Sequence, residues 1–305
     1  MHPAISVIFF TVTSGAGFGL LTFIGLGVPM PSDGVWAFIA ALLGGGLAVA
    51  GLISSTFHLG HPERAWRAFS QWRSSWLSRE GVCAVITLFA FGFYALFWVF
   101  FGERIGWLGW LVAAGSILTV FTTSMIYAQL KTIPMWNNWV TPVCYISFSL
   151  LSGCLLAASF GFWQVTFIGP IALFGLILLA ISWGVKLFWW SRGDTLEERG
   201  SSTGTATGLG KIGKVKLFER PHSGENYLTR EMVHKIGRKH AAKIRLIALL
   251  FGAILPGVLC LAALIGTSVA PFLFALAFVS LMAGLFAERW LFFAEAKHAV
   301  SLYYD

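Results

Sequence analysis

Residues 82–101 read VCAVITLFAFGFYALFWVFF, a run without a charged side chain. An α-helix of about 20 apolar residues is long enough to cross the hydrocarbon core of a bilayer. Seven further stretches share this length and apolar character: 4–28, 36–57, 107–128, 140–161, 167–189, 244–266 and 270–293. The sequence therefore predicts an all-α, polytopic membrane protein with eight transmembrane helices. They form a single membrane domain over residues 1–305, which includes the long connection 190–243.

The composition agrees with a bilayer as the solvent. Of 305 residues, 57% are hydrophobic and only 11% are charged, whereas about 25% charged residues is usual in soluble proteins. A transmembrane β-barrel is not expected, because the apolar runs are continuous and do not alternate. Tryptophans lie near many predicted span ends, as headgroup-level aromatic residues do: Trp36, Trp76, Trp107, Trp139, Trp163, Trp189, Trp190 and Trp290.

The basic residues predict the orientation. Eight spans place both termini on one side, and seventeen of the 21 Lys and Arg residues fall in the connections and tail on that side. The opposite side carries Arg104 alone, and Lys186, Arg245 and Arg289 lie at span ends. Because cytoplasmic loops carry the excess of basic residues, we expect both termini in the cytoplasm (N-in and C-in). The net charge of +8 is thus a topology signal and not a sign of nucleic-acid binding.

The cysteines and histidines argue against bound metal. All four cysteines lie inside predicted spans without a C-x-x-C pair, so neither an iron–sulfur cluster nor a zinc site is expected: Cys83, Cys144, Cys154 and Cys260. None of the seven histidines lies in the middle of a span, where axial haem ligands would face each other. We expect no haem and no metal, so an electron-transfer role would depend on a diffusible carrier or on partner subunits.

The connection between the second and third spans carries the densest pattern. Pro62 suits the first turn of a helix, and the spacing of Trp66, Phe69, Trp72 and Trp76 predicts one apolar stripe. Arg64 and Arg67 would then point the other way, which is typical of a helix lying in the membrane interface. An ordinary interfacial connector whose arginines hold lipid phosphates would explain these residues equally well.

His58 and Glu80 are not explained by such a connector. His58 closes the second predicted span and Glu80 opens the third, so antiparallel neighbours place both at one depth. An imidazole and a carboxylate facing one pocket can exchange protons near neutral pH and hydrogen-bond a carbonyl oxygen. A salt bridge from Glu80 to Arg79 or Arg73 is the alternative interpretation.

Three stretches of the chain resemble a known family. They are HLGHPERAW (58–66) followed by WLSRE (76–80), PHSGENYLTREM (221–232) leading to RKHA (238–241), and ERWLFFAEAKH (288–298). Together they resemble the membrane-anchor subunits of the dimethyl sulfoxide reductase type. The resemblance implies a haem-free, eight-helix protein that binds quinone. It also implies partners, an iron–sulfur subunit and a molybdopterin catalytic subunit, so that this chain is not catalytic alone.

The resemblance also implies roles for single residues. His58 and Glu80 would act at the quinone, and Gly60 and Arg64 belong to the same motif, with Trp66 beside them. In the dimethyl sulfoxide reductase the matching loops face the periplasm, whereas the charges here place them in the cytoplasm. The chain therefore looks more like the cytoplasm-facing sulfite dehydrogenase branch, in a bacterial cytoplasmic membrane. Alternatives are an anchor that oxidises quinol, a purely structural anchor, and a secondary transporter, against which the absence of charge at mid-depth argues.

Two polar stretches remain. The match of residues 208–213 to G-x-G-x-x-G is interpreted as spurious, because no strand and no βαβ unit fits around it. The connection 190–243 is expected to dock the iron–sulfur subunit rather than lipid, and residues 229–243 to extend the seventh span as a helix. Glu288 and Arg289 are adjacent, about 100° apart on a helix, and need not pair with each other. They are expected to pair with neighbouring helices, a proton path to quinone being the alternative.

Overall fold

The computed structural model describes residues 4–28, 34–57, 59–160, 165–199, 202–216, 218–219, 240–265 and 268–299. Eight helices in these ranges are long and apolar enough to cross a membrane, which confirms the prediction. Seven are single helices: α1 (Ile5–Gly25), α2 (Gly34–Thr56), α3 (Trp76–Phe101), α4 (Gly106–Ala128), α5 (Val140–Ala158), α6 (Val165–Arg199) and α12 (Ala270–Ala294). The remaining span joins α10 (Ala241–Leu249), a π-helical segment η4 (Leu250–Ile254) and α11 (Leu255–Ile265).

Two helices extend beyond the spans predicted for them. Helix α3 begins at Trp76 and not at residue 82, and α6 continues to Arg199, well past residue 189. Charged residues lower the apolar character of these turns, but they do not break a helix when their polar groups find partners. Arg79 donates to the carbonyl oxygens of Trp72 and Arg73, and Asp194 forms an ion pair with Arg245. Glu80 consequently lies inside a helix and does not mark its start.

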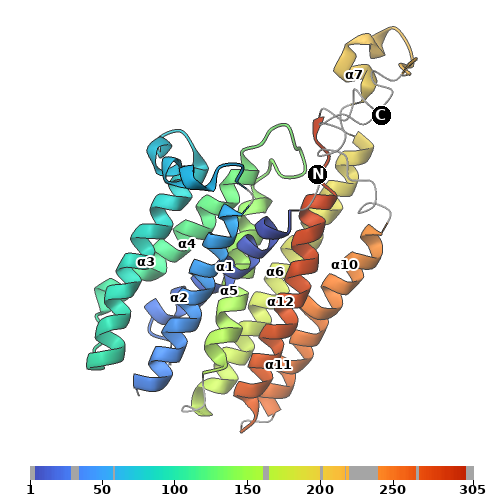
Figure 1. Cartoon of the computed structure of the whole chain (residues 1–305). Helices are drawn as coiled ribbons and strands as arrows, with labels where there is room; N and C mark the ends of the chain where they lie inside the picture. The colour runs from blue at the N-terminus through green and yellow to red at the C-terminus, as the bar shows by residue number, and fades with distance from the viewer. Residues whose placement is uncertain are drawn as a thin grey trace.

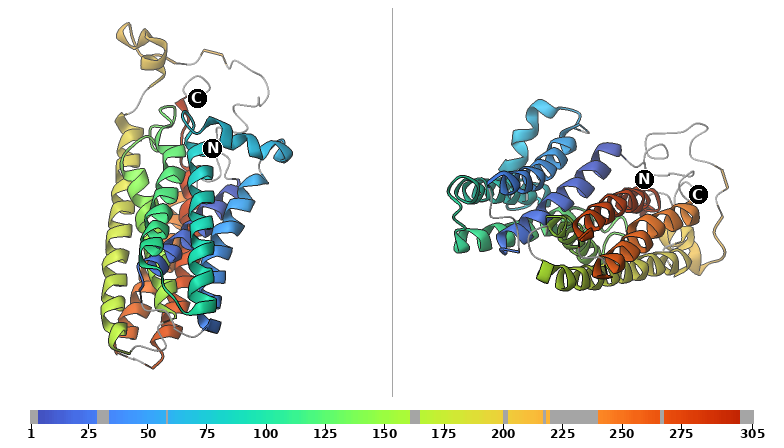
Figure 2. Two further views of the ribbon diagram at one scale, coloured as in Figure 1. Left: turned by 90° about the vertical axis from the view of Figure 1, so that its left-hand side faces the viewer. Right: turned by 90° about the horizontal axis from the view of Figure 1, so that it is seen from below.

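Helices α1 and α5 form the centre of the bundle. The most apolar stretch of α1 is 83% buried and that of α5 is 78% buried, against 33% for α2 and α3. The two helices touch through glycine, because a Cβ atom on Gly19 would lie 2.0 Å from the carbonyl oxygen of Ser149. Small residues at such crossings let backbones approach closely in a membrane. In the end-on view of Figure 2, α1 runs between the α2–α3 side of the bundle and α12.

The π-helical segment of the seventh span has a specific cause. Pro256 has no amide hydrogen, so it cannot donate to the carbonyl oxygen of Gly252 four residues earlier. The indole nitrogen of Trp183 on α6 donates to that oxygen at 2.7 Å, and the Ser280 hydroxyl on α12 donates to the neighbouring carbonyl of Phe251 at 2.6 Å. Both neighbouring helices thus satisfy the backbone groups that the irregular turn exposes, as expected where water is absent.

The polar segments gather at one end of the bundle. Figure 1 shows the connection between α2 and α3, the connection between α4 and α5, and helix α7 (Thr203–Thr207) at the same end. The 3-10 helix η1 (Pro62–Gln71) lies in the first of these connections. We call this end the polar end, and the candidate site lies there.

Candidate functional site

Glu80 is buried beside the polar end of α3. Its carboxylate is four residues from the start of the helix, about 6 Å along the axis, and the residue is only 4% exposed. The Thr123 hydroxyl on α4 donates a hydrogen bond to the Glu80 Oε1 atom. The alternative, a salt bridge to Arg79 or Arg73, is wrong. Arg79 donates to backbone carbonyl oxygens and lies over the Trp76 ring at 4.3 Å, and the Arg73 guanidinium lies 5.6 Å from the Trp72 ring centre. A carboxylate held by a neutral donor in a buried place can take up and release a proton without breaking an ion pair.

Helix η1 covers the start of α3. A 3-10 helix has three residues per turn, so Trp66 and Phe69 fall on one face of η1, and Trp72 follows directly after its last residue. The predicted short helix with an apolar stripe is thereby confirmed for Trp66 and Phe69, whereas Trp76 belongs to α3. The Ser78 hydroxyl donates to the carbonyl oxygen of Ala68, and the Phe69 ring lies against Gly81. Helix η1 therefore covers Glu80 on the side that faces the polar end.

The other predicted site residues are not buried with Glu80 where the structure describes them. His58 lies outside the described residues. Gly60, Arg64 and Trp66 are exposed, and Trp66 is 65% exposed. The Arg64 Nε atom lies 3.8 Å from Glu63 Oε1, an ion pair on the surface. The structure thus buries Glu80, whereas Gly60, Arg64 and Trp66 are exposed in the connection between α2 and α3.

A buried ion cluster lies deeper in the bundle, and it was not predicted from the sequence. We call Lys186 of α6 with Glu288 and Arg289 of α12 the ion triad; these side chains are 1%, 0% and 5% exposed. The Lys186 ammonium pairs with Glu288 Oε1, and Arg289 Nη2 lies 3.4 Å from Glu288 Oε2. The expectation that Glu288 and Arg289 need not pair is wrong, because the carboxylate accepts one cation at each oxygen. Pairing with a neighbouring helix, through Lys186, is confirmed.

Aromatic rings enclose the two cations of the triad. The Lys186 Nζ atom lies 3.7 Å from the ring centre of Trp189 and 5.2 Å from that of Trp190. The Arg289 guanidinium lies 4.0 Å from the ring centre of Tyr145. Ring faces attract cations, and the attraction reaches about 2 kcal/mol when water is excluded. Trp189 and Trp190 are 1% and 3% exposed, so both rings lie inside the bundle and do not face lipid.

Two cations of the triad lie farther inside their helices than expected from the sequence. Lys186 and Arg289 were expected at span ends, yet α6 continues for thirteen residues beyond Lys186 and α12 for five beyond Arg289. One turn after Lys186 come Trp189 and Trp190, at the i+3 and i+4 spacing at which side chains on a helix meet. This spacing is the sequence signal that could have indicated a buried lysine. The partner across the bundle, Glu288, had no such signal.

A second set of charged residues leads from the triad side of the bundle to the surface. Arg245 of α10 donates to Glu295 Oε1 at 2.9 Å and to both oxygens of Asp194 at 2.8 and 2.9 Å. The exposed fraction of these side chains rises from 8% for Glu295 to 24% for Arg245 and 58% for Asp194. Burial raises the pKa of Glu295 above its ordinary value, although Arg245 and Lys186 act to lower it. Glu295 is thus influenced both by the buried triad and by the surface pair.

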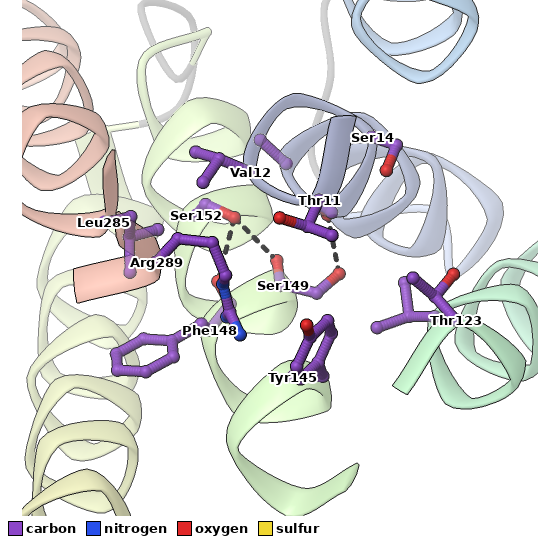
Figure 3. A pocket seen from close by; sticks show the side chains of 13 residues that line it. Thr11, Val12, Ser14, Thr123, Tyr145, Phe148, Ser149, Ser152, Leu285 and Arg289 are labelled. Carbon is purple, nitrogen blue, oxygen red and sulfur yellow. Dashed lines mark hydrogen bonds between the residues drawn. The ribbon is translucent and has the colours of Figure 1, made fainter. Parts of the chain in front are cut away.

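A polar cavity lies between Glu80 and the triad. It is bounded by α1, α4, α5 and α12, and Figure 3 shows the side chains that face it. The space open to the centre of a water molecule is about 20 Å³. Hydroxyl and charged groups from all four helices line it: Thr11, Ser14, Thr123, Tyr145, Ser149, Ser152 and Arg289. Thr123 is the donor to Glu80 and Arg289 is a member of the triad, so the cavity touches both sets.

Further predictions concern the long connection and the cysteines. A short helix, α7, and not a strand, precedes residues 208–213, which agrees with a spurious dinucleotide motif. Helix α10 begins at Ala241, and residues 229–239 of the predicted helical extension lie outside the described residues. Cys144, Cys154 and Cys260 are buried among apolar side chains, as expected of packing residues. Among the residues that the structure describes, no three His, Cys, Asp or Glu side chains group as a metal site would.

Comparison with known proteins gives consistent matches. The sequence pattern of the family described as DMSO reductase anchor subunit (DmsC) matches residues 1–294. A sulfite dehydrogenase subunit of Allochromatium vinosum is 34% identical over an alignment that covers 100% of this chain and 99% of the relative. Anaerobic dimethyl sulfoxide reductase chain YnfH of Escherichia coli K12 is 35% identical over 36% of this chain and 39% of the relative. No solved structure matches the chain significantly.

Proposed function

Because the chain belongs to the family of DMSO reductase anchor subunits, and is a multi-pass membrane protein, we propose that it is also the quinone-reactive subunit of its complex. In this proposal an iron–sulfur subunit and a molybdopterin catalytic subunit dock at the polar end, and electrons pass from the iron–sulfur subunit to membrane quinone. The chain contributes binding and proton transfer and is not catalytic alone. It would lie in the cytoplasmic membrane of a bacterium.

The buried carboxylate of Glu80 is the observation that carries this proposal. Reducing a quinone to a quinol takes two electrons and two protons, and therefore needs a group that holds protons at the site. Glu80 is a carboxylate without a charged partner among the described side chains, in a buried position where a purely structural anchor would place an apolar residue. An ionisable residue in a span is by default a sign of function.

The neighbouring segment supplies groups that suit a quinone ring. Trp66 presents an exposed indole on which a flat ring can stack, and Arg64 can donate to a carbonyl oxygen. His58 would hydrogen-bond a quinone carbonyl and deliver a proton, and Glu80 would resupply it. Gly60, in the same motif, leaves room for the ring to approach the backbone.

Orientation and similarity favour sulfite as the reductant. Basic residues are concentrated at the polar end, which by the positive-inside rule supports a cytoplasmic location for that end. The relative from sulfite dehydrogenase matches over the full length, whereas the dimethyl sulfoxide reductase chain matches over about a third of this chain. We therefore propose quinone reduction during sulfite oxidation, with quinol oxidation by a dimethyl sulfoxide reductase-like complex as the alternative direction.

Substitution of Glu80 tests the proposal. In the assembled complex, Glu80→Gln should lower quinone-coupled turnover by roughly 10²-fold or more, and His58→Ala should abolish it, with both variants still assembling. The matched control is Glu103→Gln, which makes the same chemical change at an exposed glutamate between α3 and α4 and should leave turnover unchanged. Normal quinone reduction by Glu80→Gln would refute the assigned site.

A further inference from the structure

The ion triad is not explained by membrane anchoring or by contact with quinone. Lys186, Glu288 and Arg289 are all buried, and taking charged groups out of water costs several kcal/mol for each ion. Apolar residues would pack α6 against α12 without that cost. The triad also carries two cations and one anion, so it is not a balanced pair that merely joins two helices.

The triad and Glu80 lie near the same end of the bundle. Glu288 precedes the end of α12 by six residues, about 9 Å along the helix, and Glu80 follows the start of α3 by about 6 Å. The two groups are therefore separated mainly across the bundle and not along the membrane normal. The polar cavity occupies this intervening space, with Thr123 on one wall and Arg289 on another.

The chemistry of the cavity suits water and not a quinone. Its free space of about 20 Å³ is about that of one water site, which needs roughly 10–15 Å³ and two to four polar partners. The Arg289 Nε atom is buried and has no hydrogen-bond partner among the described residues, so it has a donor to spare. The Ser152 hydroxyl donates to the carbonyl oxygens of Phe148 and Ser149, which leaves its oxygen free to accept from water.

Helix η1 covers the polar end of α3 around Glu80. The Ser78 hydroxyl is bonded to Ala68, and the Phe69 ring lies against Gly81, on both sides of Glu80 in sequence. A second way to water starts at Asp194, which is exposed, and continues through Arg245 to Glu295. The Trp190 ring contacts both sets, because Lys186 Nζ lies 5.2 Å and the Arg245 guanidinium carbon lies 5.3 Å from its centre.

We propose that protons reach Glu80 across the bundle, from the Asp194–Arg245–Glu295 surface through the ion triad and water in the polar cavity. This inference rests on the proposed function only in that Glu80 gives its protons to quinone. The Lys186 ammonium passes a proton to the Glu288 carboxylate, and Glu288 passes it to water beside Arg289, the member of the triad that lines the cavity. The water gives a proton to the Thr123 hydroxyl oxygen as that hydroxyl gives its own proton to Glu80 Oε1, and Lys186 regains a proton from the cytoplasm by way of Glu295. Arg289 and Arg245 keep their protons and hold the charges in place, because a guanidinium does not deprotonate in a protein.

Two substitutions of Lys186 separate a proton carrier from a structural cation. Lys186→Met leaves the neutral Glu288–Arg289 pair in place, so the charge of Glu288 stays compensated. Lys186→Arg keeps a cation for Glu288 but removes the exchangeable proton. If Lys186 only stabilises the bundle, Lys186→Arg should behave as the wild type. If it carries protons, both variants should be impaired.

The readout is the protonation of Glu80 itself, which needs no quinone. In the assembled complex, the infrared band of the protonated carboxyl is followed after a rapid drop in pH, and it is assigned by its loss in Glu80→Gln. Both Lys186 variants should slow the appearance of this band by roughly tenfold or more. Thr123→Val should slow it as well, whereas Thr123→Ser, which keeps the hydroxyl, should not.

Each outcome decides the matter. Wild-type protonation rates in both Lys186 variants would overturn the proposal and show that protons pass η1 directly. A normal rate in Lys186→Arg with a slow rate in Lys186→Met would overturn it in favour of a structural cation. Slow protonation in both variants, combined with normal quinone reduction by Glu80→Gln, would support the route while refuting the quinone site, so the two proposals fail separately.

Discussion

Removing the anion of the triad should destabilise the protein far more than removing one of its cations. Glu288→Gln leaves Lys186 and Arg289 buried side by side without a counter-charge. At 3.4 Å, the Arg289–Glu288 attraction alone is about 5 kcal/mol with an effective dielectric constant of about 20. Buried ion pairs that lose one partner cost about 3–5 kcal/mol in measured cases. Lys186→Met loses its ion pair with Glu288 and its contact with Trp189, the latter worth about 2 kcal/mol, but it leaves Glu288 paired with Arg289 as a neutral pair.

The assay is thermal unfolding of the purified complex or chain in detergent, followed by tryptophan fluorescence, to which Trp189 and Trp190 beside the triad contribute. We expect the midpoint temperature to fall in the order wild type, Lys186→Met, Glu288→Gln, with the larger step at Glu288→Gln. If Lys186→Met lowers the midpoint as much as Glu288→Gln does, the charges are not balanced as the structure indicates. If neither substitution lowers it, the triad is not a buried ion cluster.

Two further predictions concern the packing of the bundle and its charge balance. Gly19→Ala should prevent α1 and α5 from packing and lower the yield of folded protein, because the added Cβ would lie 2.0 Å from Ser149. Gly15→Ala, in open space on the same helix, should leave the yield unchanged; equal yields for the two variants would contradict the packing. Since electrons and protons are proposed to enter from the same side, turnover in sealed vesicles should generate no membrane potential. A potential measured with a voltage-sensitive dye would contradict that geometry.

The spans could be predicted because the bilayer imposes a length and a composition on them. The helices extend beyond the predicted spans where polar side chains find partners that only the folded chain supplies. Helix α3 contains Arg79 and Glu80 because backbone carbonyls and Thr123 satisfy them. Helix α6 continues to Arg199, and Asp194 on this extension is held by Arg245 from α10. Neither contact can be read from the hydropathy of one segment.

The candidate site could be predicted in part for the same reason. Glu80 was recognisable because ionisable residues are scarce in this chain, and the structure does bury it. Lys186 and Glu288 were each interpreted as span-end charges. They lie about a hundred residues apart in the sequence, so nothing in the sequence indicated that they pair. Their pairing depends on α6 and α12 being neighbours, which is a property of the tertiary structure. The cavity between Thr123 and Arg289 likewise has no sequence signature.

Measuring the quinone that is bound to the purified complex tests most directly whether this chain is quinone-reactive. The complex of this chain with its partner subunits should retain quinone after purification, and electrons supplied to the catalytic subunit should reduce that quinone. The same preparation carrying Glu80→Gln should leave the quinone oxidised. A complex that turns over at its full rate without bound quinone, and passes its electrons to another carrier, would contradict the central claim that this chain is quinone-reactive.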